Sequence, residues 1–374
     1  MEHYDVAVIG VGGVGSATLR TLALAGFSAV GIEQFEIAHA NGSSHGETRI
    51  IRQAYFEHPD YVPLLKLAYE LWEKIEAHSN RTLWLRNGLL EIGPPDGILI
   101  QGIESSVQTH DLPVRRLTAD ECRKTYPQYH VPEDFVAIFE ENAGVLLVEE
   151  CVKSMAEQAT QAGATLFANE PIQKIDFGNT HVLHTANQTI AAKQVVVTAG
   201  GWASNWIAPL RRHLQLRRKR LEWYSATSSR SQADARCPAF FYELPQGYFY
   251  GFPAIIQQVK VAEHSGGKVL PNPEAQNDDH AAYDEECRRR VDTFAREYLL
   301  DAQEWRKSQS CIYTVSPDEH FIVDRHPEFE NVLFAAGLSG HGFKFAPALG
   351  QILCDMTQGK KTSIADFLRL QRLT

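Results

Sequence analysis

A short apolar run near the start of the chain, residues 6–9, leads directly into three closely spaced glycines. Gly10, Gly12 and Gly15 stand in G-x-G-x-x-G spacing, and apolar residues at helical spacing follow them as far as Gly26. A strand, a glycine turn and a helix in this order place a helix N-terminus, with its unpaired N–H groups and partial positive charge, at the end of a buried strand. The sequence therefore predicts a Rossmann-type βαβ unit that binds a dinucleotide.

Each glycine of the motif has a separate expected role. Gly10 permits the tight turn, Gly12 lets the backbone approach a pyrophosphate, and Gly15 lets the helix pack close to the strand. A second apolar run, residues 28–32, ends on Glu33, which stands 23 positions after Gly10 (33 − 10). An acid at about this spacing binds a ribose hydroxyl, and it disfavours the 2′-phosphate of NADP. The predicted ligand is therefore NAD or FAD.

Composition and charge narrow the class of protein. The chain has 374 residues, of which 44% are hydrophobic and 22% charged, so it is long enough for two globular domains. A net charge of −10 disfavours a nucleic-acid or anionic-membrane partner. No apolar run is long enough to span a membrane and no leader-like segment precedes the first strand, so we expect a cytoplasmic protein. Six scattered cysteines without a C-x-x-C pair favour buried thiols over disulfides or zinc.

Two kinds of structure alternate along the chain. Buried strands followed by glycines recur at residues 195–201 and 332–342, and the second of these leads into a helix from about 345 to 358. Short aromatic strands between residues 223 and 262 are instead typical of an antiparallel sheet. The predicted fold is α/β, with a discontinuous Rossmann-type FAD-binding domain and a second, mainly antiparallel-sheet substrate domain. The expected ranges are 1–85, 145–215 and 312–374 for the first domain, and 86–144 and 216–311 for the second.

FAD is preferred over NAD for two reasons. The late strand–glycine–helix return at residues 332–345 aims a second helix N-terminus at the cofactor, where its dipole would stabilise the negative charge of a reduced flavin. The chain also lacks a second G-x-G-x-x-G unit for a separate nicotinamide nucleotide. A basic run at residues 211–220 is interpreted as a solvated crossing between the domains, with one or two of its members near the phosphates or the flavin. Asp60 is expected to cap a helix beginning near Tyr61.

Several motifs resemble the signature of the monomeric sarcosine oxidase and N-methyltryptophan oxidase family. In chain order they are residues 41–52 (NGSSHGETRIIR), 250–253 (YGFP), 259–261 (VKV), 311–314 (CIYT), 317–321 (PDEHF) and 337–345 (GLSGHGFKF). They extend over essentially the whole chain. The resemblance implies a two-domain, monomeric amine oxidase that binds FAD covalently. It also implies oxidation of N-methyl amino acids to the imine, with O2 reduced to hydrogen peroxide.

The resemblance assigns cofactor roles to individual residues. Cys311 matches the position at which the family attaches the flavin through a thioether, whereas the residues around it, taken alone, favour an ordinary buried thiol. His45 belongs to the loop that contacts the flavin, and no second His or Cys lies at ligand spacing to make it a metal ligand. The full set expected at the cofactor is Gly10, Gly12, Gly15, Glu33, Ser43, His45, Thr48, Cys311, Gly340, Gly342 and Lys344.

Four residues are expected at the reaction centre. Lys260 lies in an apolar strand and matches the family lysine beside the flavin, where a positive charge would stabilise superoxide as the first electron reaches O2. The alternative is a lysine on the solvated side of an edge strand. Arg49 is expected over the flavin ring, and Tyr250 and His264 beside the reacting amine. His264 also has the alternative of belonging to a polar turn, residues 263–267.

Arg52 and Lys344 match the family residues that bind the substrate carboxylate, which requires paired cations in a desolvated pocket. Surface salt bridges are the alternative for both. Phe241 stands where the sarcosine type carries Met and the N-methyltryptophan type carries Thr, so neither substrate can be transferred directly. Two other functions stay open: an FAD dehydrogenase that passes electrons to a quinone or a partner protein, and a flavin-binding protein without activity.

Overall fold

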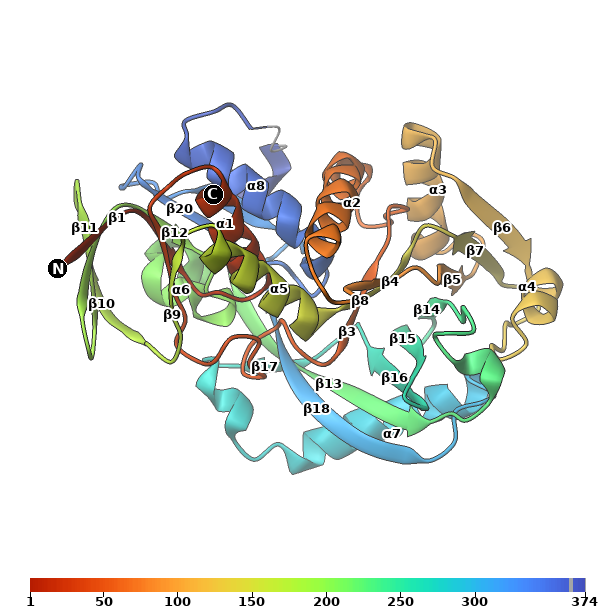
Figure 1. The fold of residues 1–374 in the computed structure, drawn as a ribbon. Coiled ribbons are helices and arrows are strands. Elements are labelled where there is room, and N and C mark those ends of the chain that lie inside the picture. The colour runs from red at the N-terminus through yellow and green to blue at the C-terminus, as the bar shows by residue number, and fades with distance from the viewer. Residues whose placement is uncertain (363–365, 374) are drawn as a thin grey trace.

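Two large sheets and one small sheet organise the chain. The computed structural model describes residues 1–362 and 366–373, so residues 363–365 and 374 of the expected range 312–374 lie outside the described residues. In the described part, a mixed sheet of eight strands and a largely antiparallel sheet of nine strands lie at opposite ends of the molecule (Figure 1). The expected α/β fold with a second, mainly antiparallel sheet is confirmed.

The first sheet is built around the N-terminal strand. Its strands in spatial order are β10 (Ile172–Asp176), β11 (His181–Thr185), β12 (Thr189–Val197), β1 (Glu2–Ile9), β2 (Ala29–Ile32) and β9 (Thr165–Phe167), with β20 (Val332–Ala336) and β19 (Ile322–Arg325) continuing from β12. The strands β20, β12, β1, β2 and β9 are parallel to one another. Their side chains pack on both faces: Val6 and Val8 join one core cluster, and Ala7 and Ile9 join another. Burial on both sides explains why these strands are continuous apolar runs.

Helices cover both faces of this sheet. On one face α1 (Gly13–Leu24) packs between α5 (Val148–Gln161) and α8 (Ala346–Thr357), and α2 (Val62–Ala77) packs against α8 (Figure 1). On the other face, the short helix α6 (Ala203–Trp206) contributes to the second cluster. The expected cap by Asp60 is wrong. A 3₁₀ turn, η1 (Pro59–Tyr61), runs directly into α2, and its own N-cap is His58, whose side chain accepts a hydrogen bond from the backbone N–H of Asp60.

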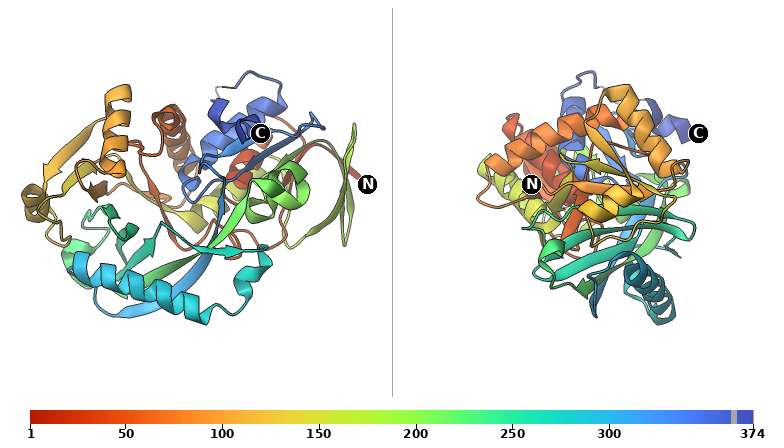
Figure 2. Two further views of the ribbon diagram at one scale, coloured as in Figure 1. Left: turned by 180° about the vertical axis from the view of Figure 1, so that it is seen from behind. Right: turned by 90° about the vertical axis from the view of Figure 1, so that its right-hand side faces the viewer.

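The second sheet carries the long strands. In spatial order it contains β17 (Lys268–Leu270), β13 (Gln215–Ser225), β16 (Gln258–Glu263), β15 (Gly247–Ile255), β14 (Ala239–Leu244), β5 (Leu89–Gly93), β7 (Val136–Glu140) and β6 (Val114–Thr118), with β18 (Trp305–Val315) on the free side of β13. The pairing is antiparallel throughout except between β5 and β14. Helix α7 (Ala281–Tyr298) runs along one face, as both views of Figure 2 show, and α3 (Ile98–His110) and α4 (Ala119–Thr125) lie at the far end.

Alternation along β14 and β15 divides the aromatic side chains between two faces. Phe240 and Phe249 pack on α7, where Phe249 stacks on Phe294 with ring centroids 4.6 Å apart. Phe241 and Tyr250 point to the opposite face, because successive side chains of a strand point to opposite sides. One face of the sheet is therefore a closed core, and the other is available to form a pocket.

The basic run at residues 211–220 is a solvated crossing only in its first part, where Arg211 and Arg212 are exposed. Its second half begins β13, which is paired on both edges, so Arg218 and Lys219 are buried. Arg218 binds Asp284 at 2.8 Å, and Lys219 donates to backbone carbonyls. Because β13 and β18 pair continuously across the expected borders at 215/216 and 311/312, both strands cross them. The division into domains stays a prediction.

The small sheet consists of β3 (Thr48–Ile51), β8 (Gly144–Leu147) and β4 (Trp84–Leu85), paired antiparallel. Strand β3 directly follows the segment 41–47 and directly precedes Arg52. Several residues that the sequence singled out therefore sit on or beside one short strand. Among the described residues, no helix is both long and apolar enough to cross a membrane.

Candidate active site

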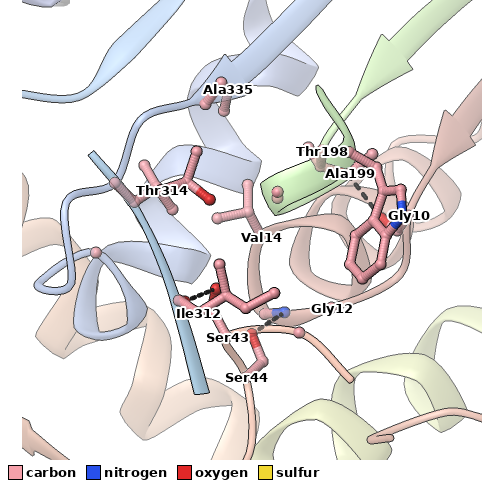
Figure 3. A pocket seen from close by; sticks show the side chains of 18 of the residues that line it. Gly10, Gly12, Val14, Ser43, Ser44, Thr198, Ala199, Ile312, Thr314 and Ala335 are labelled. Carbon is pink, nitrogen blue, oxygen red and sulfur yellow. Dashed lines mark hydrogen bonds between the residues drawn. The ribbon is translucent and has the colours of Figure 1, made fainter. Parts of the chain in front are cut away.

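A cavity of about 330 Å³ opens where the parallel strands β1, β12 and β20 end. This is the edge of an open α/β sheet at which ligands bind. Chain segments that are distant in sequence line the cavity, as Figure 3 shows: the loop of Gly10, Gly12 and Val14, the pair Ser43 and Ser44, the strand end at Thr198 and Ala199, Ile312 and Thr314 of β18, and Ala335 of β20.

The three motif glycines take the positions that their expected roles require. Gly10 has φ +83°, a conformation that side chains other than glycine rarely adopt. A Cβ atom on Gly15 would lie 1.9 Å from the carbonyl oxygen of Gly10, so helix α1 could not pack against the turn with any other residue there. A Cβ on Gly12 would meet only the side chain of Ser44, at 3.5 Å, because this side faces the cavity. Backbone can therefore approach a ligand at Gly12.

Glu33 lies at the end of β2 and lines the same cavity. Its Oε2 accepts a hydrogen bond from the backbone N–H of Val11 at 2.7 Å, and its Oε1 accepts one from Phe35 at 3.1 Å. The His39 Nε2 atom lies 3.4 Å from Oε1. A carboxylate accepts about four hydrogen bonds, so capacity is left for a ribose hydroxyl. Glu33 thus holds the glycine loop in place while remaining able to bind a ligand.

Several buried polar atoms around the cavity have no hydrogen-bond partner among the described residues. They include Thr314 Oγ1 on the cavity wall, and Thr48 Oγ1 and His45 Nδ1 in the adjoining segment. Buried polar groups are ordinarily paired, so these atoms indicate a partner supplied by a ligand. Ser43 Oγ donates to the carbonyl of Ile312 at 2.6 Å and ties this segment to β18. The glycine loop, Glu33 and the unpaired Thr314 hydroxyl fit FAD.

The loop after β20 closes the cavity from the C-terminal side. Gly340 has φ +84°, and a Cβ there would lie 2.1 Å from the ring of Tyr313. Gly342 packs equally tightly, because its Cβ would lie 2.5 Å from the side chain of Leu338. Both glycines line the cavity, and a 3₁₀ turn, η6 (Phe343–Phe345), then leads into α8. The expected return of strand, glycines and helix is confirmed.

Lys260 and Cys311 lie behind the cavity wall. Lys260 is buried in β16, between two paired strands, so the alternative of a solvated edge lysine is wrong. Its Nζ donates to the carbonyls of Gly46 and Thr48 at 2.7 and 2.8 Å. Burial, reinforced by Arg49, lowers the pKa of Lys260 well below its usual range. Lys260 therefore anchors the loop that carries the expected flavin contacts.

Cys311 is a buried free thiol. Its immediate successors Ile312 and Thr314 line the cavity, whereas Cys311 itself lies beside the wall. Burial raises the pKa of this thiol, and the nearby charges of Arg49, Lys260, Lys219 and Arg218 act in the opposite direction. The effect of burial is the larger one, so the pKa of Cys311 lies above its usual range and the neighbouring cations only partly favour the reactive thiolate.

A second pocket of about 50 Å³ adjoins the cavity. Arg49, Tyr313, Gly340 and Phe343 line both, so the two spaces share a wall. The smaller pocket brings together all six residues that the sequence assigned to substrate or catalysis apart from Lys260: Arg49, Arg52, Phe241, Tyr250, His264 and Lys344. Sequence reasoning missed Glu57, Tyr313 and His341, which also line it.

The cationic side of this pocket is buried, so surface salt bridges are excluded for both Arg52 and Lys344. Arg52 Nη2 contacts the two carboxylate oxygens of Glu57 at 2.8 and 2.9 Å. Lys344 Nζ donates to the carbonyl of His341 at 2.7 Å, and the backbone of Lys344 is held by Trp72. Burial, together with the charge of Arg52, lowers the pKa of Lys344 to about 7. No sequence motif surrounds Glu57, so its pairing with Arg52 in the pocket could not be predicted from the sequence.

The aromatic side of the pocket comes from the second sheet. The hydroxyls of Tyr250 and Tyr313 lie 3.4 Å apart, and Tyr313 lies 3.4 Å from His264 Nδ1. Burial, and then the charge of Lys219, lowers the pKa of His264 to about 3, so the ring is neutral at physiological pH. Lys219 donates to the carbonyl of His264 at 2.9 Å and anchors the turn. His264 therefore belongs to a polar turn and also faces the pocket.

Phe241 fills the remaining part of this wall. Its ring centroid lies 5.5 Å from that of Phe56, 5.9 Å from that of Tyr248 and 5.9 Å from that of His264. The ring is thus held by aromatic neighbours from the segment that follows β3 and from the second sheet with the turn after β16. No group of three or more His, Cys, Asp or Glu that could hold a metal occurs among the described residues.

Comparison with known proteins agrees with this geometry. Residues 5–356 match the family described as FAD dependent oxidoreductase. The chain belongs to this family. Proteins named N-methyl-L-tryptophan oxidase from Yersinia pestis (strain Pestoides F) and Yersinia pseudotuberculosis serotype O:1b (strain IP 31758) are each 37% identical to it over 363 residues, 96% of this chain and 96% of theirs. The resemblance found from the motifs is confirmed.

Solved structures of two oxidases and a dehydrogenase share the fold. NikD, an unusual amino acid oxidase essential for nikkomycin biosynthesis, superposes with a TM-score of 0.85 at 22% identity, covering 99% of this chain and 98% of its own. Glycine oxidase from Geobacillus kaustophilus superposes with a TM-score of 0.81 at 21% identity, covering 100% of this chain and 99% of its own. L-proline dehydrogenase from P. horikoshii superposes with a TM-score of 0.82 at 19% identity, covering 100% of this chain and 98% of its own. Because oxidases and a dehydrogenase share it, the fold alone does not determine the electron acceptor.

Proposed function

We propose that this chain is an FAD-dependent oxidase of secondary amines that oxidises N-methyl amino acids to the imine and reduces O2 to hydrogen peroxide. The observation that carries the proposal is the shared wall between the two spaces, formed by Arg49, Tyr313, Gly340 and Phe343. One space has the glycine loop of a dinucleotide site, and the other has buried cations beside aromatic rings. A substrate in the smaller space would lie directly next to a cofactor in the larger one.

Different residues of the small pocket bind different parts of the substrate. Arg52 and Lys344 bind the substrate carboxylate, which requires Glu57 to give up its place on Arg52. Bound in the cavity, FAD supplies the two-electron oxidation of a carbon–nitrogen bond. The substrate reacts as the neutral amine, because an ammonium has no free lone pair. Positive charge on Arg49 and Arg52 lowers the pKa of the amine by repulsion.

Aromatic and neutral groups orient the amine. Tyr250 and the neutral His264 lie beside it, and Phe241 limits the volume open to the substrate side chain. None of these groups needs to act as a base. Their contribution is to hold the reacting carbon toward the shared wall and to keep water out, which strengthens electrostatic interactions in the pocket.

Lys260 and Cys311 serve the cofactor in this proposal. The Lys260 charge stabilises superoxide as O2 takes up the first electron. Cys311 would hold the flavin through a thioether: the thiol and a methyl group of the flavin ring would each lose one hydrogen, and both hydrogens with their two electrons would pass by way of the flavin to O2, giving hydrogen peroxide. The link is tested by denaturing the purified protein in acid or SDS and filtering it. Yellow colour retained with the polypeptide, and lost in Cys311→Ser, supports the link; colour that passes entirely into the filtrate contradicts it.

The proposed reaction is tested with an oxygen electrode and a peroxide assay across a panel of N-methyl amino acids. Steady O2 uptake with an equal amount of hydrogen peroxide is the expected result. Reduction of a quinone dye without O2 uptake would instead identify a dehydrogenase. A flavin band that no amine bleaches would identify a binding protein without activity.

We also propose that the enzyme works as a monomer in the cytoplasm. The resemblance of the motifs to the monomeric sarcosine oxidase family supports this proposal. Sedimentation equilibrium of the holoenzyme should give the mass of one chain, 41.9 kDa. A stable mass of twice that value would contradict the monomer.

A further inference from the structure

A buried acid lies beneath the small pocket without any role in the site described so far. Glu91 stands in the middle of β5 and is fully buried. Neither of its carboxylate oxygens has a hydrogen-bond partner among the described residues. In the sheet register Glu91 lies directly beside Phe241 of β14, and Phe241 lines the pocket. Paired residues on neighbouring strands point to the same face, so the carboxyl of Glu91 points toward the pocket floor.

The group closest to this acid is Arg52. Glu91 Oε1 lies 3.6 Å from Arg52 Nη1, which also donates to the carbonyl of Ala54 at 3.1 Å. The backbone N–H of Ala54 is in turn held at 2.9 Å by Glu140 on the neighbouring strand β7. The Nη1 edge of Arg52 therefore faces the sheet. The Nη2 edge faces Glu57, which lines the pocket.

The two acids beside Arg52 are in different states. Glu57 makes a close bidentate pair with the guanidinium, and its pKa is lowered by the charge of Arg52 against the opposing effect of burial. Burial raises the pKa of Glu91 to about 8, because Arg52 only partly offsets the loss of solvation. Glu91 is therefore a neutral carboxylic acid at neutral pH. It can orient Arg52 without cancelling the positive charge that a substrate needs.

A buried carboxyl without hydrogen bonds is costly, and a branched apolar side chain would fill the same strand position more cheaply. The neighbouring positions Leu90 and Ile92 carry such side chains. We propose that Glu91 is a positioning residue, which holds the Nη1 edge of Arg52 against the sheet so that the Nη2 edge stays aimed at the point where the substrate carboxylate replaces Glu57. This inference rests on the proposed function of the pocket.

The first test compares carboxylate binding by the holoenzyme and its variants, using acetate as the probe and the change in the visible flavin band as the signal. Glu91→Leu should weaken acetate binding about tenfold, the effect of losing one interaction with a charged group. The KM for an N-methyl amino acid should rise by a similar factor while kcat stays within about twofold. Glu91→Gln, which keeps the shape and a polar oxygen, should restore binding to near the wild-type value.

Glu222→Gln is the matched control. Glu222 is also fully buried in the second sheet, also has an oxygen without a hydrogen-bond partner and also lies near an arginine, Arg220 at 3.5 Å. Its hydrogen bonds go to Trp305 and Ser308, outside the pocket. This variant should bind acetate like the wild type. Arg52→Gln tests the proposed function separately: unchanged acetate binding there would reject the carboxylate site itself, whereas a loss confined to Arg52→Gln would reject only the role of Glu91.

A pH profile gives a signal that a purely structural role of Glu91 would not produce. The titratable groups acting on Glu91 are Arg52 and Glu57 in the segment after β3, Glu140 on β7, Tyr69 on α2, and Lys344. As the pH rises through about 8, wild-type Glu91 ionises and repels the incoming carboxylate, so acetate binding should fall more steeply than in Glu91→Gln. The other groups are common to both proteins. Coincident profiles, together with wild-type binding in Glu91→Leu, would overturn the inference.

Discussion

The cavity and the adjoining pocket are built from different materials, although they share a wall. The cavity is formed largely by backbone and small side chains, such as Gly10, Gly12 and Ser44. The pocket is formed by long or aromatic side chains, among them Arg52, Glu57 and Lys344. A phosphate-bearing cofactor can be recognised by backbone N–H groups at a helix terminus, whereas a small amino acid requires side chains that converge from distant segments.

This difference affects the energetics of each region. Glycine positions in the cavity are fixed by steric limits, since there is no space for a Cβ at Gly15 or Gly340. In the pocket, by contrast, charges are buried and depend on one another, since Arg52 is held by one acid and oriented by another. A substitution of a cavity glycine should therefore act by steric clash, whereas a substitution in the pocket should act by changing the interactions of buried charges. Five predictions test this contrast.

The largest effect is expected when Arg52 is replaced by leucine, because the ionised Glu57 then loses the cation with which it pairs. The free energy of unfolding should fall by about 3–5 kcal/mol, measured by urea denaturation at neutral pH. Arg230→Leu is the control, because Arg230 pairs with Asp301 in a half-exposed position and should cost under about 1 kcal/mol. Equal losses in the two variants would show that the buried charges of the pocket are not coupled.

Lys260 is the buried charge on the cavity side, and its loss should affect chemistry more than binding. In Lys260→Met, reoxidation of the reduced enzyme by O2 should slow by about 10²–10³-fold, the effect of removing one preorganised electrostatic group, while reduction by substrate should be retained. Stopped-flow absorbance measures both steps. Lys307→Met is the control, since Lys307 is half exposed and pairs with Glu47. An unchanged rate of reoxidation in Lys260→Met would show that Lys260 does not promote the reaction with O2.

Two glycine variants separate packing from ligand approach. Gly15→Ala should destabilise the protein by about 1–3 kcal/mol, because the new methyl group would lie 1.9 Å from the Gly10 carbonyl oxygen. Gly12→Ala has space in the protein and should keep its stability, but it should retain less FAD after purification. Thermal unfolding and the flavin-to-protein absorbance ratio measure the two properties. Lost stability in Gly12→Ala together with lost FAD but normal stability in Gly15→Ala would contradict the roles given to these glycines.

Two buried neutral histidines, one beside the cavity and one in the pocket, should make the stability of the protein sensitive to acid. Burial lowers the pKa of His45 to about 3 and that of His341 to about 4, from an ordinary value of 6.5. Below pH 6.5 the unfolded chain binds protons that the folded chain does not, so stability should fall as the pH drops from 6.5 toward 4. The slope is about 1.4 kcal/mol per pH unit for each histidine. His341→Gln should reduce the slope of Tm against pH; an unchanged slope would show that His341 is protonated in the folded protein.

The smallest effect is expected at Phe241. Phe241→Thr removes a ring packed against Phe56 and Tyr248, and it should enlarge the pocket. The ratio of kcat/KM for a bulky N-methyl amino acid to that for a small one should rise by about tenfold. Steady-state kinetics with two substrates of different size measure the ratio. If the ratio does not move, Phe241 does not limit the side-chain space.

The difference between the cavity and the pocket also explains which site residues could be predicted from the sequence. Strand β1, the glycine turn and Glu33 are contiguous or separated by one helix, so local pattern alone predicted them. Glu57 and Glu91 could not be found this way. A single acid carries no signal, and the burial of Glu91 arises only when β5 pairs with β7 and β14.

The basic run around Arg218 was misinterpreted for a related reason. Arg218 and Lys219 look solvated in sequence, yet they lie in a strand paired on both edges and are satisfied by Asp284 and by backbone carbonyls. Those partners lie on other elements, at least 40 residues further along the chain. Positions whose side chains depend on tertiary partners were therefore the ones that the sequence did not reveal. The resemblance to a known family supplied most of the pocket residues instead.

Anaerobic mixing of the holoenzyme with N-methyl amino acids tests the central claim most directly, because it joins the cofactor in the cavity to the substrate in the pocket. The claim predicts that the visible flavin band bleaches in a saturable manner, and that Arg52→Gln raises the substrate concentration needed for half the maximal rate. A yellow protein whose band is unaffected by every N-methyl amino acid, or a purified protein that binds no flavin, would contradict it.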